Sequence, residues 1–178
     1  MSVAPLVSRE SPALLPLERN TLPLVEMWLS QEENYKWLDF SPLVQPLNAM
    51  VLKMMAQKPQ HFIQVFRVDT SPAGIVALSN INQSAGTATL WYLLGNKQYA
   101  GQGYTTRAVS RLLRTAFFDL KLACLEAWAA ESNTASIAIL KRNGFVYVGT
   151  RRQCHVIDGR RHDRLWFDLL SSEYKEIA

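Results

Sequence analysis

Hydrophobic and polar residues change their spacing several times along this chain, and each spacing predicts a different element. The apolar segment at 14–17 is short and contains a proline, so it fits only an edge strand. Helical spacing then follows Thr21, which is placed to cap a helix that carries a proline in its first turn. A second helix, with Leu and Met residues on one face, is expected from Pro46 to Lys58-Pro59. The chain therefore begins with the order β-α-α.

The middle of the chain is rich in β-branched and aromatic residues and is divided by turn-forming residues. Strands are expected at 61–68, 75–81 and 87–94, with turns at 69–74 and 82–86. Connections this short favour antiparallel pairing. This part of the chain therefore predicts a three-stranded meander.

Helices and strands alternate in the second half of the chain. Asn143-Gly144 is a good helix stop, and Asp158-Gly159 is a strong hairpin-turn pair. The order of elements predicts an α+β fold, with seven strands and about four helices in a single domain over residues 1–178. The expected elements are a helix at 105–120, a strand at 123–130, a helix at 133–142 and strands at 145–157 and 162–170.

The composition adds limits to this prediction. The chain has 178 residues, 48% of them hydrophobic and 19% charged, which suits a folded domain with its own core. Residues 1–12 are expected to be a loose arm. The net charge of +4 mildly favours an anionic ligand. The basic residues are spread along the chain, however, which argues against a nucleic-acid-binding protein.

Cysteine usage and hydropathy favour a cytoplasmic protein. Cys124 and Cys154 do not have the spacing of a metal site, and Cys124 lies in an apolar strand pattern that is typical of a buried thiol. No signal-peptide pattern is visible, and no apolar run approaches the roughly 18 residues of a membrane span. We expect no metal and no membrane contact, and the protein could be a monomer or a homodimer.

A glycine-rich segment just before the helix at 105–120 has the clearest chemistry. Gly101 and Gly103 let the backbone approach a bulky group because they lack Cβ. A helix start presents free N–H groups and the positive end of the helix dipole, so a cofactor phosphate is expected here. A dinucleotide site would need a glycine at Thr106 and a βαβ unit instead of a meander. The segment reads Gln98-Tyr99-Ala100-Gly101-Gln102-Gly103-Tyr104-Thr105-Thr106.

Together with three later features, this segment resembles the signature of the GNAT acetyltransferases. The resemblance extends from about residue 14 to the C-terminus. Within the family, the chain resembles the branch of ribosomal-protein N-terminal acetyltransferases, and its segments 94–99 and 158–163 are also similar to acetyltransferases of nucleotide-linked amino sugars. The shared features, in the family's order, are Gln98-x-x-Gly101-x-Gly103, Asn133-x-x-Ser136, Asn143-Gly144-Phe145 and the Asp-Gly hairpin.

The resemblance implies a mixed (α/β), mostly antiparallel sheet, splayed between its fourth and fifth strands, that binds acetyl-CoA in the gap. Pantetheine would pair with the open strand edge near Leu93 and Leu94, and the backbone N–H near Leu93 would donate to the thioester oxygen. The pyrophosphate would lie on the N–H groups of 99–105. The implied cofactor-binding residues are Leu93, Leu94, Gln98, Tyr99, Ala100, Gly101, Gln102, Gly103, Tyr104, Thr105, Asn133 and Ser136.

Acetyl transfer to an amine needs a base for the ammonium proton and a proton for the departing thiolate. Two features of many family members are missing. The strand at 87–94 has Thr and Trp where a Glu is common, and Leu140 stands where a Tyr is common. The resemblance instead makes Ser136 the candidate acid and Asn133 the residue that orients the cofactor or a water. The alternative is that Ser136 fills a helix turn and Asn133 caps it.

His155 is the main candidate for the base. It titrates near neutral pH, and the resemblance places it where related enzymes carry a Glu. The alternative is an exposed strand histidine without a role. His61, His162 and Glu126 are weaker candidates.

No motif determines the acceptor. Arginines around the last hairpin would suit an anionic acceptor, such as a sugar-nucleotide diphosphate or an acidic protein tail. Alternatively, they form a solvated edge that blocks strand pairing. We therefore predict an acetyl-CoA-dependent N-acetyltransferase that acts by direct transfer on a protein N-terminus or a small-molecule amine. A nucleotide-linked amino sugar as acceptor and a non-catalytic acyl-CoA sensor are the alternatives. The arginines are Arg151, Arg152, Arg160 and Arg161.

Overall fold

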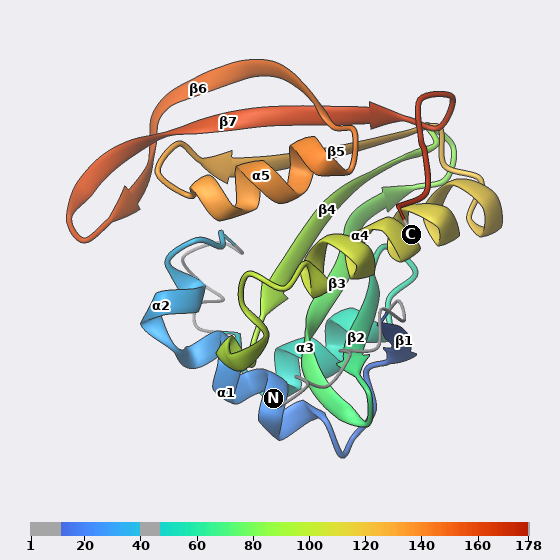
Figure 1. The fold of residues 1–178 in the computed structure, drawn as a ribbon, viewed down its shortest axis with the longest axis vertical. Coiled ribbons are helices and arrows are strands. Elements are labelled where there is room, and N and C mark those ends of the chain that lie inside the picture. The colour runs from blue at the N-terminus through green and yellow to red at the C-terminus, as the bar shows by residue number, and fades with distance from the viewer. Residues whose placement is uncertain (1–11, 40–46, 178) are drawn as a thin grey trace, which may run out of the picture.

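The computed structural model describes residues 12–39 and 47–177, which form one sheet with helices on both faces (Figure 1). The sheet has seven strands in the order β1-β2-β3-β4-β5-β7-β6, so the predicted seven-stranded α+β fold is confirmed. The strands are β1 (Ala13–Pro16), β2 (Phe62–Val68), β3 (Ser71–Asn82), β4 (Thr87–Leu94), β5 (Cys124–Ala130), β6 (Val146–Ile157) and β7 (Arg160–Leu170). The helices are α1 (Leu22–Ser30), α2 (Glu32–Tyr35), α3 (Ala49–Ala56), η1 (Lys97–Tyr99), α4 (Tyr104–Arg114), η2 (Thr115–Asp119) and α5 (Thr134–Arg142).

β4 and β5 form a short parallel pair in a sheet that is otherwise antiparallel among the described strands. They pair through three residues each and then diverge (Figure 1). β4 continues to Leu94 with β3 on one side, so its other edge faces the gap. The predicted splay is therefore confirmed. The paired residues are Thr87 with Cys124, Ala88 with Leu125, and Thr89 with Glu126.

Two hydrophobic clusters pack against the sheet, and Figure 1 shows α4 on one face of the sheet and α1 and α3 on the other. One contains the apolar side of α4, and Tyr92 packs against it. The other contains residues of α1 and α3, and Trp91 packs against it. Successive side chains of a strand point to opposite faces, so β4 presents different residues to each side of the gap. We call the two sides the α4 face and the α3 face.

The starts of two helices differ in detail from the sequence prediction. α1 begins where expected, but Thr21 makes no capping hydrogen bond to the helix. Its hydroxyl instead donates to the carbonyl of Glu18 at 3.0 Å. α3 begins at Ala49, after the predicted start at Pro46, which lies outside the described residues. Asn48 caps this helix by accepting a backbone N–H at 3.0 Å.

Other boundaries of helices and strands also differ from those predicted from the sequence. The chain reverses at Asp69, whose φ is 53°, so β3 starts at Ser71 within the predicted turn. The predicted helix at 105–120 is α-helical only to Arg114 and ends in the π-helical turn η2. The short helix α2 was not predicted, which makes five α-helices in the described residues instead of about four. The predicted arm lies outside the described residues, apart from its last position.

Across residues 12–39 and 47–177, no helix has the length and apolar character needed to cross a membrane.

Candidate active site

A cleft of about 920 Å³ opens where β4 and β5 part. It passes between the two faces of the sheet, because it is lined by α5 and the glycine-rich segment and also by α2, α3 and His61, which directly precedes β2. Of the predicted cofactor-binding residues, Gln98 and Gln102 do not line it, whereas the following do: Leu93, Leu94, Tyr99, Ala100, Gly101, Gly103, Tyr104, Thr105, Asn133 and Ser136.

The glycine-rich segment forms an open loop of backbone donors. Gly101 and Gly103 have φ of 73° and 78°, in the left-handed region that other residues seldom adopt. The backbone N–H groups of 101–106 have no acceptor within hydrogen-bond distance among the described residues. A Cβ added at Gly101 would meet nothing within 4 Å, so the space above the loop is free. These features fit the phosphate group that the sequence predicted.

Asn143 fixes α5 against the first turn of α4. This side chain is buried, and its Nδ2 donates to the carbonyl oxygens of Thr106 at 3.2 Å and Ile139 at 3.0 Å. Gly144, with φ of 85°, then lets the chain leave the helix. The Asn-Gly pair therefore ends α5 and also holds the N-terminus of α4 beside it.

Tyr92 and Ser136 meet on the α4 face of the cleft. The Tyr92 hydroxyl lies 2.7 Å from Ser136 Oγ and donates to the Ser136 carbonyl at 3.0 Å. Burial raises the pKa of Tyr92 well above its ordinary value, so the phenol stays protonated in the neutral pH range. Tyr92 was not among the candidate residues predicted from the sequence. A polar tip at an inward-facing strand position could have been a signal, but its partner is 44 residues away.

Asn133 lies at the N-cap of α5 and lines the cleft. Its Oδ1 accepts the backbone N–H of Ser136 at 3.1 Å. This bond satisfies a donor of the first helical turn and fixes the backbone of Ser136. The capping alternative for Asn133 is therefore observed, and its Nδ2 is the group with which it could also contact a ligand.

Glu126 lines the α3 face of the cleft at the last residue pair between β4 and β5. The Thr89 hydroxyl donates to Glu126 Oε1 at 2.9 Å, and Asn80 Nδ2 donates to Thr89 Oγ1 at 3.4 Å. Asn80 lies in an irregular part of β3 and has φ of 54°. β-Bulges often redirect side chains beside active sites. Here the irregular strand places Asn80 where it donates to Thr89, which in turn donates to the Glu126 carboxylate.

His61 is a second titratable group on the α3 face of the cleft. Its Nδ1 lies 3.0 Å from the Ser79 hydroxyl, which also accepts from Trp91 Nε1 at 2.9 Å. Burial and the nearby positive charge of Lys58 lower the pKa of His61, so the ring is neutral at pH 7. A neutral imidazole is able to accept a proton.

His155 occupies a different environment from the one predicted for a base. It is buried, it is not among the residues that line the cleft, and both ring nitrogens have partners. Nε2 lies 2.7 Å from the carbonyl oxygen of Lys36, and Nδ1 lies 2.9 Å from Arg164 Nη2. Because a carbonyl only accepts, Nε2 carries the proton and Nδ1 accepts from the guanidinium. Burial lowers the pKa of His155.

The remaining candidates lie away from the cleft. His162 is on β7, with its Nδ1 3.6 Å from Glu131 Oε1, and does not line the cleft. The four arginines of the last hairpin are exposed and are also absent from the cleft lining, so the structure does not bring them to the predicted acceptor site. They are Arg151, Arg152, Arg160 and Arg161.

No group of three or more His, Cys, Asp or Glu side chains in the described ranges is arranged to hold a metal ion. The cleft instead combines backbone donors for an anion, a protonated phenol with a serine, and a carboxylate on the opposite face. This arrangement can hold two substrates from opposite sides of the sheet and exchange protons with both.

Comparison with known proteins places this cleft in a family context. Residues 13–146 match the model of the acetyltransferase (GNAT) domain. Among curated relatives, the chain is similar to YdaF of Bacillus subtilis, which is named as a ribosomal N-acetyltransferase, with 32% identity over 107 residues. That match covers 60% of this chain and 58% of YdaF, which is less than two thirds of the relative's length.

Two solved structures are similar in fold. Spermidine N-acetyltransferase from Vibrio cholerae, in complex with CoA and spermine, has a TM-score of 0.80 and 19% identity, over 92% of this chain and 98% of that one. The ribosomal L7/L12 α-N-protein acetyltransferase RimL, in complex with CoA, has a TM-score of 0.78 and 18% identity, over 92% and 96% of the two chains.

Proposed function

Because the chain belongs to the acetyltransferase (GNAT) family, we propose that it transfers an acetyl group from acetyl-CoA directly to a primary amine in a ternary complex. The observation that carries this proposal is the cleft between β4 and β5. It has an anion-binding loop and the Tyr92–Ser136 pair on one face, and the Glu126 carboxylate on the other. Two substrates that enter from opposite faces would meet at the open edge of β4.

The acetyl-CoA side of the cleft is assigned to the glycine-rich segment and to the open edge of β4. Backbone N–H groups of 101–106 would bind the pyrophosphate of acetyl-CoA, and the edge of Leu93 and Leu94 would pair with its pantetheine arm. Bound acetyl-CoA would supply the activated acetyl group as a thioester. The predicted roles of Asn133 and Ser136 at this end of the cleft fit their positions in its lining.

Proton transfer is assigned to one group on each face. Glu126 would take the proton of the acceptor ammonium, and Thr89 holds its carboxylate in place. On the other face, Ser136 would protonate the departing thiolate, and Tyr92 would support it through their 2.7 Å hydrogen bond. His61 is the second candidate base, because it lines the cleft and is neutral at pH 7.

His155 is not retained as the base. A base needs a free lone pair directed at the substrate, and the Nδ1 lone pair of His155 already accepts from Arg164. Its bond to the Lys36 carbonyl instead joins the chain after α2 to β6. We assign His155 a structural role on the acceptor side of the cleft.

The proposal is tested by measuring thiol release from acetyl-CoA in the presence of a panel of amines. The panel includes alkylamines, amino acids, peptides with free N-termini and a nucleotide-linked amino sugar. Mass spectrometry should find the acetylated amine, and incubation with acetyl-CoA alone should leave no acetyl group on the protein. If acetyl-CoA binds but no amine is acetylated, the sensor alternative is supported instead.

Similar proteins suggest where the acceptor search should start. YdaF and RimL are named for ribosomal protein acetylation, whereas the neighbour from Vibrio cholerae is named for spermidine acetylation. Both kinds of acceptor carry a primary amine. An anionic acceptor has less support, because the arginines proposed to bind it do not line the cleft.

A further inference from the structure

Three of the tryptophans that line the cleft do not belong to the hydrophobic interior of the protein. Trp37 follows α2, Trp128 lies on β5 and Trp166 lies on β7. All three are partly exposed and line the cleft, and none is a member of either hydrophobic cluster of the described residues. Large aromatic rings that a core does not use are a common feature of ligand pockets. We call these three residues the indole wall.

Two tryptophans of the indole wall lie on the same face of the sheet as the proposed base. Trp128 is two residues after Glu126 on β5, so both side chains point to the α3 face. Trp166 is paired directly with Trp128 across β5 and β7. Its partner on β6 is Gly149, which has no side chain to cover the indole. An acceptor whose ammonium lies at Glu126 would therefore have the two indoles beside it.

The two paired indoles differ in how far the protein already uses them. The Arg164 guanidinium carbon lies 4.1 Å from the centre of the Trp128 ring, and the His155 ring lies 5.3 Å from it. Trp166 has no ring pair, cation–π contact or hydrogen bond with any residue that the structure describes. Trp166 therefore lines the cleft with an aromatic surface that has no such partner in the fold.

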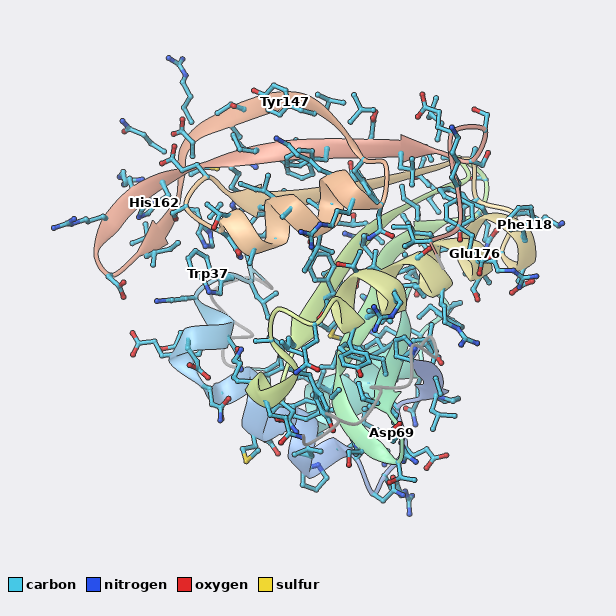
Figure 2. All side chains as sticks on the ribbon, in the orientation of Figure 1. Trp37, Asp69, Phe118, Tyr147, His162 and Glu176 are labelled. Atoms are coloured by element: carbon cyan, nitrogen blue, oxygen red, sulfur yellow. The ribbon has the colours of Figure 1, made fainter. Side chains whose placement is uncertain are left out.

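Trp37 lies on the segment that follows α2, and this segment is fixed to the strands beyond the cleft (Figure 2). The carbonyl of Lys36, just before it, accepts from His155 Nε2 at 2.7 Å, and Asp39, just after it, forms an ion pair with Arg164. His155 is on β6 and Arg164 is on β7. A segment held in this way narrows the approach to the cleft, which suits a small acceptor better than a protein surface.

Apolar side chains from α3 and the chain before it extend this lining. Leu47, Val51 and Met55 line the cleft, and they belong to the hydrophobic cluster of α1 and α3 or pack against it. Removing apolar ligand surface from water against such side chains favours binding. An uncharged, apolar ligand body is therefore favoured in this part of the cleft.

Several polar side chains of the same region have partners within the protein. The Ser79 hydroxyl is bonded to His61 Nδ1 at 3.0 Å, and the Thr89 hydroxyl lies between Asn80 and Glu126. A sugar ring placed there would leave hydroxyl groups without partners, and an unpaired polar group removed from water weakens binding. The lining therefore disfavours a polyhydroxylated acceptor.

From the indole wall and the apolar lining we infer that the acceptor is a small arylalkylamine, in which a short alkyl chain joins a primary amine to an uncharged aromatic ring. This inference rests on the proposed acetyl transfer. The amine would lie at Glu126, and the ring would pack against Trp128 and Trp166. Residues two apart on a strand are separated by about 7 Å, which is close to the length of 2-phenylethylamine from its nitrogen to the far side of its ring.

Four amines test the kind of body that the cleft accepts: 2-phenylethylamine, 2-cyclohexylethylamine, glucosamine and diaminobutane. The first two are similar in size, but only the first is aromatic, while the others are hydroxylated or carry a second charge. The kcat/KM for 2-phenylethylamine should exceed that for 2-cyclohexylethylamine by about fivefold, the size expected for aromatic pairing beyond burial of area. It should exceed the values for glucosamine and diaminobutane by at least about tenfold, because these bury less apolar surface.

A higher kcat/KM for any of the other three amines, or for a peptide N-terminus, would overturn the inference. Equal values for the two amines with six-membered carbon rings would also overturn it, because the indoles would then not recognise an aromatic ring. Thiol release with any amine keeps the proposed function, whereas absence of thiol release with every amine would contradict the proposed function itself.

Trp166→Leu removes an aromatic ring from the indole wall and keeps an apolar side chain. The ratio of kcat/KM for 2-phenylethylamine to that for 2-cyclohexylethylamine should fall to about one, mainly through KM for 2-phenylethylamine, and Trp166→Phe should retain most of the ratio. The matched control is Phe118→Leu, which removes an exposed aromatic ring outside the cleft lining and should leave the ratio unchanged. Both substrates are measured on the same protein, so a loss of folded enzyme does not alter the ratio. An unchanged ratio in Trp166→Leu would contradict the inference.

Discussion

The hydroxyl groups of Tyr92 and Ser136 lie 2.7 Å apart and join β4 to α5 across the cleft. Tyr92 comes from the strand whose open edge faces the gap, and Ser136 comes from the first turn of the helix that lines its α4 face. A phenol is therefore present near Ser136, although Leu140 occupies the helix position where many family members carry a tyrosine. A raised pKa keeps this phenol protonated, which suits a hydrogen-bond donor during catalysis.

Tyr92→Phe should lower kcat for acetyl transfer by about 10- to 100-fold, because general acid assistance to the leaving thiolate is weakened. Ser136→Ala should have an effect of similar size, and the double variant should lose little more, since the two groups act as one unit. KM for acetyl-CoA should change much less than kcat. Steady-state kinetics on the four proteins at saturating amine measures these effects.

The matched control for this prediction is Tyr174→Phe. Tyr174 also donates its hydroxyl to a backbone carbonyl, that of Ser110 at 2.9 Å, but it lies outside the cleft lining. The Tyr174→Phe variant should keep kcat within about twofold of the parent protein. Full turnover by Tyr92→Phe, at a folded fraction equal to the control, would remove Tyr92 from the mechanism.

Glu126→Gln should lower kcat/KM for the amine by about 100-fold, because the amide cannot take the ammonium proton. Thr89→Val should cause a smaller loss of about tenfold, since it removes the 2.9 Å hydrogen bond but leaves the carboxylate in place. Initial rates at varied amine and saturating acetyl-CoA provide the measurement.

Glu176→Gln serves as the control for that series. Glu176 lies 3.8 Å from Arg114 on the side of the molecule away from the α2 segment (Figure 2). Its replacement should leave kcat/KM for the amine unchanged. An unchanged kcat/KM in Glu126→Gln would transfer the base assignment to His61, which the corresponding His61→Gln variant would then have to support.

The sequence was most informative about features that depend on residues close together in the chain. The glycine loop, the cap at Asn133 and the stop at Asn143 are local features, and their spacing is visible without a fold. Contacts between distant segments were not predictable in this way. Tyr92 and Ser136 are 44 residues apart, Thr89 and Glu126 are 37 apart, and the partner of His155 is 119 residues away. A strand pattern gives the face of a residue but not its partner on another element.

His155 illustrates the limit of reasoning from residue type. A histidine near the end of a strand was a reasonable base candidate because of its ordinary pKa. Its burial and its two partners depend on how the chain after α2 folds back onto β6 and β7, and no local signal in the sequence encodes that contact.

Gly101→Ala should weaken acetyl-CoA binding by about tenfold, since a Cβ would enter the free space above the loop and the residue would be strained at φ of 73°. Gly159→Ala is a close match, because Gly159 has φ of 74° in a hairpin turn and also has nothing within 4 Å of an added Cβ. Both variants should lose about 1 kcal/mol of stability. Calorimetric titration with acetyl-CoA should detect weaker binding in Gly101→Ala alone, and equal affinities would contradict the loop assignment.

Stability should fall as the pH is lowered through the range in which an unfolded histidine becomes protonated. Burial lowers the pKa of His155 in the folded protein, so the unfolded chain binds a proton at a higher pH than the folded chain does. The free energy of unfolding therefore decreases from about pH 7.5 to about pH 5, and His61 contributes with the same sign. His155→Gln should flatten this slope, and it should also lower stability at neutral pH because the bond to the Lys36 carbonyl is disturbed. Urea denaturation at several pH values measures the slope, with His162→Gln in the same hairpin as the control that retains His155. A slope in His155→Gln as steep as that of the parent protein would show that another group dominates the acid sensitivity.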